Sequence, residues 1–425
     1  MIDILNKLFS RTNNLDNISF ELKNLSTRTP ASKIFQAINS FSSSSEVRYV
    51  GGCVRKIINS EKVDDIDLAT NLNPRETCEA LKKNEIDYYE TGIEHGTITA
   101  LIEDYKFEIT SLREDVSTDG RFAQVKFSKD WKKDASRRDF TINAIYSDKE
   151  GNLFDPYNGR EDLIKGEIKF IGDPEKRIQE DYLRILRYLR FFLIYSKKDH
   201  NIEIIKSLKR NLIGISKISK ERLIDELKKI LKPKILTKLS KDKKTLEILE
   251  AIFPELKYFK VFSNLNSHTK NIIHELDFIF IISLLIIDET DNSDYFLYKF
   301  NISKNDAKRL RNISEFYKEK ITTNTFSEKN MNKILYYKGK ATLIDILIFR
   351  MFKLKKRVDD HIIELIKKYE EKRIPIMPIK AEFLMSKFNI PEGKILGDKL
   401  RLIENEWVSN NFQISDQEVE NIIHN

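Results

Sequence analysis

Residue types that define several protein classes are scarce in this chain of 425 residues. Two cysteines, Cys53 and Cys78, are too few for a disulfide scaffold or a four-cysteine zinc site, and we expect reduced thiols in a cytoplasmic protein. With 13 glycines and 9 prolines, a collagen-like or linker-dominated architecture is excluded. The longest apolar run, residues 278–287, is too short to cross a bilayer, and the N-terminus lacks the features of a signal peptide. We therefore expect no membrane partner.

The residues that are abundant fit a folded, basic protein. Hydrophobic residues make up 40% of the chain and charged residues 33%, which suits packed cores and excludes a disordered chain. A prior of roughly 150 residues per domain predicts two to four domains. The formal net charge of +8 is compatible with a polyanionic partner such as RNA. A codon-biased genome that enriches Lys would produce the same excess of positive charge. Charge alone leaves both explanations open.

The texture of the sequence changes along the chain. Residues 1–30 look weakly structured, 31–40 read as a short amphipathic helix, and 47–146 alternate between strand-like and helix-like runs. Helical periodicity dominates after Pro174. We predict an α+β fold in which a mixed-sheet head precedes an all-α neck, body and tail. The predicted segments are an N-terminal extension (1–30), a head (31–147), a neck (148–250), a body (251–370) and a tail (371–425).

The most informative segment combines a glycine pair with two aspartates. Gly51-Gly52 follows a predicted strand and precedes a predicted helix, an arrangement that lets a phosphate approach the backbone, and Arg55 adds a cation in the first helical turn. Asp65 and Asp67 are two residues apart on a predicted strand and so face the same side. Two close carboxylates repel each other unless a divalent cation lies between them, which predicts a magnesium site. Either pattern alone also fits a plain turn or a solvated strand.

A third carboxylate lies on another predicted strand. Glu108 belongs to the run 106–112, which forms a predicted hairpin with 97–102. If that strand neighbours the one carrying the aspartates, Glu108 completes an acidic cluster.

An ordered set of motifs resembles the polymerase β-type nucleotidyltransferase superfamily, and more narrowly the class II tRNA nucleotidyltransferases, or CCA-adding enzymes, and their poly(A) polymerase relatives. The motifs run from about residue 47 to 230. They are Gly51-Gly52-x-Val54-Arg55, Asp65-Ile66-Asp67-Leu68-Ala69-Thr70, Thr91 to Thr97, Phe107 to Arg113, Asp119-Gly120-Arg121, Arg137-Arg138-Asp139, Phe154 to Gly159 and Glu180-Asp181-x-x-Arg184-x-x-Arg187.

This resemblance implies an enzyme that adds or repairs the 3′-terminal CCA of tRNA from CTP and ATP and releases pyrophosphate. It implies tRNA as the nucleic-acid partner and not DNA. Asp65 and Asp67 would hold Mg²⁺, with Glu108 as the third catalytic acid. The implied nucleotide-binding residues are Gly51, Gly52, Arg55, Arg138, Asp181, Arg184, Arg187 and Arg190.

The hydrogen-bonding groups of Asp181 and Arg184 suit them to select the base of the nucleotide. On one predicted helix, 180–195, they are i, i+3 neighbours that can project together. Cytosine and adenine each present an amine donor beside a ring-nitrogen acceptor, whereas uracil and guanine present a carbonyl beside an N–H. A carboxylate only accepts and a guanidinium only donates, so the pair matches C and A. Spacing alone equally fits a solvated Arg-rich helix, and the resemblance implies the template role.

Three other activities stay open at this point. They are a partial activity that adds only CC or only A, a poly(A) polymerase, and a non-catalytic RNA-binding protein. Retention of both aspartates argues against the last.

Overall fold

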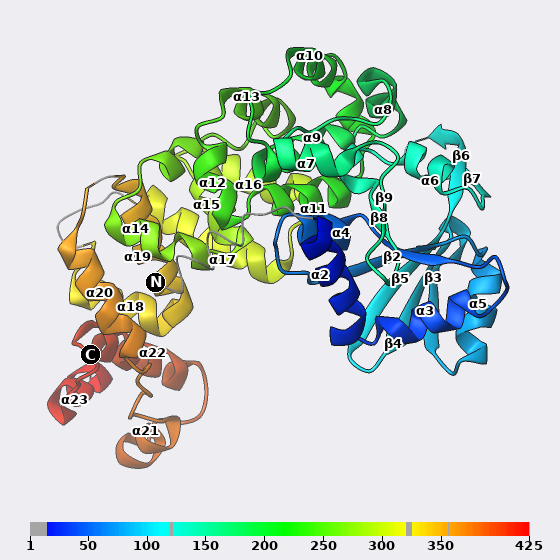
Figure 1. Ribbon diagram of the computed structural model, residues 1–425. Helices are drawn as coiled ribbons and strands as arrows, with labels where there is room; N and C mark the ends of the chain where they lie inside the picture. The colour runs from blue at the N-terminus through cyan, green and yellow to red at the C-terminus, as the bar shows by residue number, and fades with distance from the viewer. Residues whose placement is uncertain (1–14, 120–121, 320–324, 356, 425) are drawn as a thin grey trace, which may run out of the picture. The chain divides into compact units, whose positions relative to one another are not determined.

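The computed structural model describes residues 15–119, 122–319, 325–355 and 357–424 (Figure 1). The chain divides into two compact units, Met1–Ile230 and Leu231–Asn425. Every strand of the described residues belongs to the first unit, and the second unit is helical. This arrangement confirms the prediction of a mixed-sheet head followed by helices. The five segment boundaries stay predictions, and the division between the units falls inside the predicted 148–250 segment.

A seven-stranded mixed sheet forms the centre of the first unit, with the strand order β3-β4-β5-β2-β1-β8-β9. The pairing of β2 with β5 is parallel and the other pairings are antiparallel. The strands are β1 (Val47–Val50), β2 (Ile66–Thr70), β3 (Asp87–Gly92), β4 (Thr97–Ile102), β5 (Tyr105–Ser111), β8 (Tyr146–Ser147) and β9 (Leu153–Phe154). Because β2 is central, a residue at its N-terminal end lies beside β1 on one side and β5 on the other.

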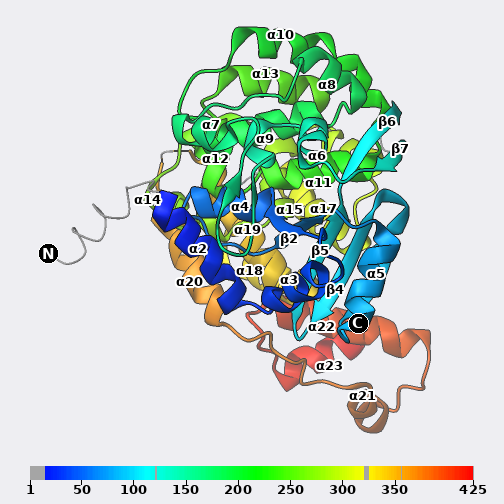
Figure 2. The ribbon, with the colours of Figure 1, turned by 45° about the vertical axis from the view of Figure 1, so that its right-hand side comes forward.

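The predicted hairpin of two strand-like runs is confirmed, because β4 pairs with β5 along its whole length. A second antiparallel pair, β6 (Arg113–Asp119) and β7 (Phe122–Phe127), forms a separate ribbon that stands apart from the main sheet in both views (Figure 2). Gly120 and Arg121 of the Asp-Gly-Arg motif lie outside the described residues. The ribbon leaves the sheet directly after β5.

Helices α3, α4 and α5 pack against the sheet. The start of α5 shows why a helix begins there: the Asn73 side chain accepts a hydrogen bond from Glu76 N, the Glu76 carboxylate accepts one from Asn73 N, and Pro74 occupies the first turn. The helices of this unit are α2 (Leu15–Arg28), α3 (Ala31–Asn39), α4 (Gly52–Ile58), α5 (Pro74–Lys83), α6 (Trp131–Arg137), α7 (Gly159–Lys165), α8 (Pro174–Glu180), α9 (Arg184–Tyr195), α10 (Ile202–Arg210) and α11 (Lys220–Ile230).

Helix α2 corrects the prediction that the first thirty residues are weakly structured. Ile18 and Leu22, one turn apart, are buried, and the Ser19 hydroxyl donates to the Gly151 carbonyl oxygen at 2.9 Å. Gly151 has a φ of +88°, and a Cβ there would lie 2.2 Å from the Ser19 carbonyl oxygen. Tertiary contacts therefore stabilise a segment whose Asn, Ser and Thr residues are poor helix formers. Residues 1–14 lie outside the description.

The second unit is built from helices with apolar interiors. In α15 every residue from Ile279 to Ile286 is buried, which identifies the longest apolar run as a core helix. No helix in the described residues is long and apolar enough to cross a membrane. The helices are α12 (Pro233–Leu239), α13 (Lys243–Ile252), α14 (Ser267–Ile272), α15 (Phe278–Ile286), α16 (Asn292–Phe300), α17 (Lys304–Lys318), α18 (Glu328–Lys338), α19 (Lys340–Lys353), α20 (Asp360–Glu371), α21 (Ala381–Phe388), α22 (Lys394–Ser409) and α23 (Asp416–His424).

Candidate active site

A cavity of about 650 Å³ in the first unit collects almost all of the predicted site residues. Its lining includes ten Lys and Arg side chains and four Asp side chains. The predicted residues in the lining are Gly51, Gly52, Arg55, Asp65, Asp67, Arg138, Asp181, Arg184, Arg187 and Arg190. An excess of six cationic side chains over acids makes this cavity suited to a polyanion.

The glycine pair forms a tight turn between β1 and α4. Gly51 has a φ of +66°, where a residue with a Cβ is strained. A Cβ on Gly52 would lie 3.3 Å from the Asp67 carboxylate oxygen Oδ2. The backbone of this turn therefore lies directly beside the Asp67 carboxylate in the cavity lining.

The two aspartates lie at the start of β2, although only Asp67 belongs to the strand. Asp65 is exposed and immediately precedes the first strand residue, Ile66. Within the described part of the chain, neither carboxylate forms a hydrogen bond or ion pair. The strand assignment of Asp65 is thus off by one residue, although both aspartates belong to the cavity lining.

Glu108 lies directly across from Asp67 in the parallel pairing of β2 with β5. It is exposed and does not belong to the cavity lining. Glu108 nevertheless affects the titration of Asp67. Burial and then the charges of Glu108 and Asp65 raise the pKa of Asp67 above its ordinary value. The charges of Arg138 and Arg55 oppose this shift. The role of Glu108 as a third catalytic acid stays a prediction.

The donor set of this acidic corner fits magnesium and not a metal that needs a cage of protein ligands. No cluster of three His, Cys, Asp or Glu side chains suited to hold a metal occurs in the residues that the structure describes. Magnesium is commonly bound by one or two carboxylates together with substrate phosphates and water. Within the described residues, the two unpaired aspartates beside the glycine turn provide that kind of incomplete site. A cation there would counteract the burial and the acid repulsion that raise the pKa of Asp67.

Two predicted phosphate-binding arginines lie beside the glycine turn. Arg55 is buried, donates from Nη1 to Asn143 Oδ1, and stacks its guanidinium 4.8 Å from the Phe191 ring centroid. Among the residues that the structure describes, its Nε has no hydrogen-bond partner. Arg138 donates from Nε to the Tyr146 hydroxyl at 2.9 Å and from Nη2 to Asp134 Oδ2 at 3.1 Å. Both side chains are therefore fixed at the cavity wall by protein contacts before any ligand binds.

The segment with Asp181 and Arg184 is not the single helix that periodicity predicts. Helix α8 ends at Glu180, Asp181 is extended with a φ of −152°, and α9 begins at Arg184. Leu183 N donates to Asp181 Oδ1 at 3.1 Å, which makes the aspartate part of the turn between the helices. Both Asp181 and Arg184 nevertheless line the same cavity.

Each member of this pair has its own partner. Arg222 Nη2 donates to Asp181 Oδ2 at 2.8 Å, and Arg184 Nη1 donates to Glu180 Oε2 and to the Arg177 carbonyl oxygen, both at 2.6 Å. Within the described residues, Nε and Nη2 of Arg184 donate no hydrogen bond. Arg184 therefore keeps donors for a ligand, and the pair is assembled by the surrounding protein.

The other two arginines of α9 are paired with buried acids. Arg187 Nε donates to Asp139 Oδ2 at 2.6 Å, and Arg190 forms a short ion pair with Glu226, whose side chain is only 2% exposed. Burial alone would raise the pKa of Asp139, but Arg187 and further donors hold it well below its ordinary value. All three arginines of α9, Arg184, Arg187 and Arg190, therefore line the cavity.

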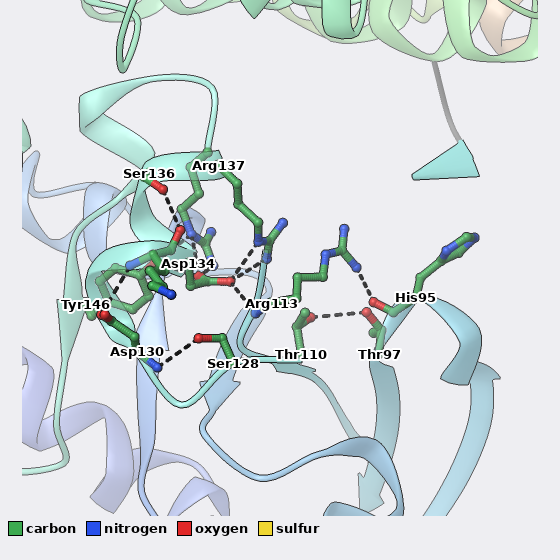
Figure 3. A network of polar contacts seen from close by, with 12 residues as sticks. His95, Thr97, Thr110, Arg113, Ser128, Asp130, Asp134, Ser136, Arg137 and Tyr146 are labelled. Carbon is green, nitrogen blue, oxygen red and sulfur yellow. Dashed lines mark hydrogen bonds and ion pairs between the residues drawn. The ribbon is translucent and has the colours of Figure 1, made fainter. Parts of the chain in front are cut away.

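Sequence reasoning missed several side chains of the lining, among them Arg113, Arg137, Arg222 and Lys229. It also assigned no role to the acids that pair with the lining arginines, among them Asp134 and Glu226. The Arg222 and Glu226 spacing of four residues on α11 was visible, but that spacing is typical of exposed helix pairs. Figure 3 shows Arg113 at the root of the β6–β7 ribbon, where its guanidinium donates to the His95 carbonyl oxygen.

Comparisons with known proteins agree with this geometry. Residues 47–169 match the family model described as the poly A polymerase head domain. The chain is 47% identical over 189 residues to the human mitochondrial CCA tRNA nucleotidyltransferase 1, a match that covers 44% of each chain. It is 31% identical over 308 residues to a CCA-adding enzyme of Staphylococcus haemolyticus, covering 71% of this chain and 72% of that one. A CCA-adding enzyme of Ligilactobacillus salivarius is 30% identical over 88% and 91% of the two chains.

Solved structures share the fold. The chain matches a Bacillus stearothermophilus CCA-adding enzyme in complex with CTP with a TM-score of 0.69 and 20% identity, over 92% of this chain and 95% of that one. A Thermotoga maritima CCA-adding enzyme complexed with tRNA_CCA matches with a TM-score of 0.60 and 21% identity, over 92% and 94%. The matched region spans less than half the length of the vertebrate relatives, whereas it covers most of the bacterial ones.

Proposed function

This chain belongs to the family of CCA-adding enzymes, and we propose that it adds or repairs the 3′-terminal CCA of tRNA from CTP and ATP with release of pyrophosphate. The observation that carries the proposal is the composition of one cavity. Two aspartates that have no hydrogen bond or ion pair among the described residues lie in it near a glycine turn, together with arginines that are mostly paired with protein acids. Such a cavity accommodates a nucleoside triphosphate with a divalent cation.

Asp65 and Asp67 would hold magnesium, the cation that their oxygen donors and incomplete ligand set fit. Bound magnesium lowers the pKa of an attacking hydroxyl and neutralises charge on the reacting phosphate and the pyrophosphate. The Gly51-Gly52 turn gives a phosphate close access to the backbone, and Arg55 and Arg138 supply cations beside it. In this arrangement the tRNA 3′-hydroxyl attacks the α-phosphate, a P–O bond to the tRNA forms, and the bond to pyrophosphate breaks.

Asp181 and Arg184 would read the base edge. The Asp181 carboxylate accepts from the exocyclic amine of cytosine or adenine, and free N–H groups of Arg184 donate to the adjacent ring nitrogen. Uracil and guanine would set a carbonyl against the carboxylate and an N–H against the guanidinium. Leaving such groups unpaired costs roughly 1–3 kcal/mol each. Protein side chains would thereby take the place of a nucleic-acid template.

The direct test is to sequence the 3′ ends made from a tRNA that lacks CCA, with CTP and ATP supplied singly and together. We expect C-C-A on tRNA with both nucleotides and little extension of a generic RNA oligomer. Products that stop at CC, or A added only to a tRNA ending in CC, would show a partial activity. Long A tails on any RNA would show a poly(A) polymerase and overturn the proposal. A cytoplasmic location stays a prediction, since the relatives include mitochondrial and bacterial proteins.

A further inference from the structure

A buried carboxylate outside the cavity lining holds together three elements that border it. Asp134 lies on α6 and its side chain is 1% exposed. It is absent from the cavity lining, whereas the two arginines that follow it on the chain, Arg137 and Arg138, are both part of that lining. Asp134 therefore cannot touch a nucleotide, and any effect it has on the reaction must pass through its neighbours.

The contacts of Asp134 use both carboxylate oxygens (Figure 3). Oδ1 accepts from Arg137 Nε at 2.8 Å and Nη2 at 2.6 Å, and Oδ2 accepts from Arg138 Nε at 3.2 Å and Nη2 at 3.1 Å. The Tyr146 hydroxyl, on β8, donates to Oδ2 at 2.7 Å and accepts from Arg138 Nε at 2.9 Å. Arg138 Nη1 donates to the Asn143 carbonyl oxygen at 3.4 Å, and among the described residues Arg137 Nη1 donates no hydrogen bond.

One more contact reaches the β6–β7 ribbon. The backbone N–H of Arg113, the first residue of β6, donates to Asp134 Oδ1 at 3.4 Å. The same region is packed by an apolar cluster that includes Leu112, Ala135 and Tyr146. The carboxylate consequently lies where the sheet, α6 and the ribbon meet.

Two physical effects follow from one buried charge between two guanidinium groups. The carboxylate offsets the repulsion between Arg137 and Arg138, which would otherwise disfavour holding them side by side in a partly desolvated wall. It also fixes side chains that would lose rotamer freedom on binding a ligand, so less entropy is lost at the moment of binding. The side chains of the two arginines are 15% and 18% exposed, and both belong to the cavity lining.

We propose that Asp134 is a positioning residue that orients Arg137 and Arg138 toward the bound nucleotide and fastens them to the root of the β6–β7 ribbon. The inference rests on the proposed function, because it assumes that the cavity binds a nucleoside triphosphate.

The test compares two aspartates on the same helix. Asp134→Asn keeps the side-chain volume and removes the charge, and we expect at least a tenfold rise in the Kd of CTP measured calorimetrically with Mg²⁺, with a matching rise in KM. Asp130→Ala removes the N-cap of α6, where Asp130 accepts from Lys132 N and Lys133 N, and leaves the arginines untouched. It should lower the melting temperature and leave the CTP affinity within twofold of wild type.

A second variant keeps the question decidable if Asp134→Asn does not fold. Tyr146→Phe removes one hydroxyl that contacts both Asp134 and Arg138 and retains every charge, and we expect a two- to fivefold loss of CTP affinity with a folded protein. Wild-type affinity in Tyr146→Phe and in any folded Asp134→Asn would overturn the inference. The inference would also be overturned if Asp130→Ala lost as much CTP affinity as Asp134→Asn, in proportion to its loss of melting temperature. Because CTP binding is measured without tRNA, a wild-type protein that binds CTP but adds nothing to tRNA would refute the proposed function and leave this test intact.

Discussion

Two groups of carboxylates lie in the cavity lining or directly behind it, and they differ in their nearest charges. Asp65 and Asp67 at the start of β2 have no paired cation in the described residues, and burial with the neighbouring acids raises the pKa of Asp67. Asp134 and Asp139 are more deeply buried, yet adjacent arginines lower the pKa of each. Burial opposes ionisation in both places, so the difference comes from the partner. The second group is complete within the protein, whereas a cation from outside would complete the first.

The comparison predicts that the unpaired group carries the chemistry. Asp67→Ala should lower nucleotide incorporation by about 10³-fold or more, since a metal ion contributes several kcal/mol to stabilising the transition state and each 1.36 kcal/mol is tenfold in rate. Binding of tRNA, measured by gel retardation, should change little. The exposed neighbour Asp64, which pairs with Lys56, provides the control variant Asp64→Asn, expected to act within a few-fold of wild type. Full activity in Asp67→Ala would remove the metal assignment.

At Asp181 and Arg184, also in the cavity lining, we expect substitutions to change the selectivity for the base more than the rate of incorporation. In Asp181→Ala or Arg184→Ala, discrimination against UTP and GTP should fall by about ten- to a hundredfold, because each removes a group worth roughly 1–3 kcal/mol in selectivity. The measurement is kcat/KM for each of the four nucleotides. Lys229→Ala provides the control, since Lys229 lines the same cavity and contacts neither residue. Unchanged discrimination at a near-normal rate would exclude the template role.

Local patterns predicted the parts of this site that depend on local backbone. The Gly51-Gly52 turn and the strand with Asp67 could be predicted because a strand, a turn and a helix follow one another in the sequence. The expected neighbouring strand is β5, whose parallel pairing with β2 places Glu108 beside Asp67. The turn at Asp181 was missed because apolar spacing continues through it, and periodicity does not detect one extended residue between two helices. Helix α2 was missed because its stability comes from contacts with α3 and α4.

The partners of the arginines could not be predicted for a different reason. Glu226 is separated from Arg190 by 36 residues, and nothing near it in the sequence distinguishes it from the exposed acid that precedes it. Asp134 similarly stands in a polar stretch that reads as a surface helix. Whether an acid is buried beneath an arginine depends on how distant segments pack, which one sequence does not reveal.

Two adjacent acids on α11 test the effect of pairing at another buried acid. Glu226 is 2% exposed and binds Arg190, whereas Asp225 is 65% exposed and lies 3.6 Å from Lys228. Glu226→Gln should lower the free energy of unfolding by about 3 kcal/mol, because it leaves a buried guanidinium without its counter-charge. Asp225→Asn should change it by less than about 0.5 kcal/mol. Equal effects in urea denaturation would show that the buried pair contributes no more than a surface pair.

The smallest expected effect concerns acid stability. Burial would raise the pKa of Asp134, but the charges of Arg138 and Arg137 outweigh it and lower the pKa from 3.8 to about 2. A lowered folded-state pKa gives stability that is present above the unfolded value and lost as the pH falls toward the folded one. Protonation of Asp134 alone should therefore lower the free energy of unfolding by about 1 kcal/mol between pH 5 and pH 3. In Asp134→Asn the measured decline over that interval should be smaller by this amount, whereas Asp130→Asn should decline as wild type does. An identical decline in all three proteins would mean that the arginines do not hold Asp134 ionised.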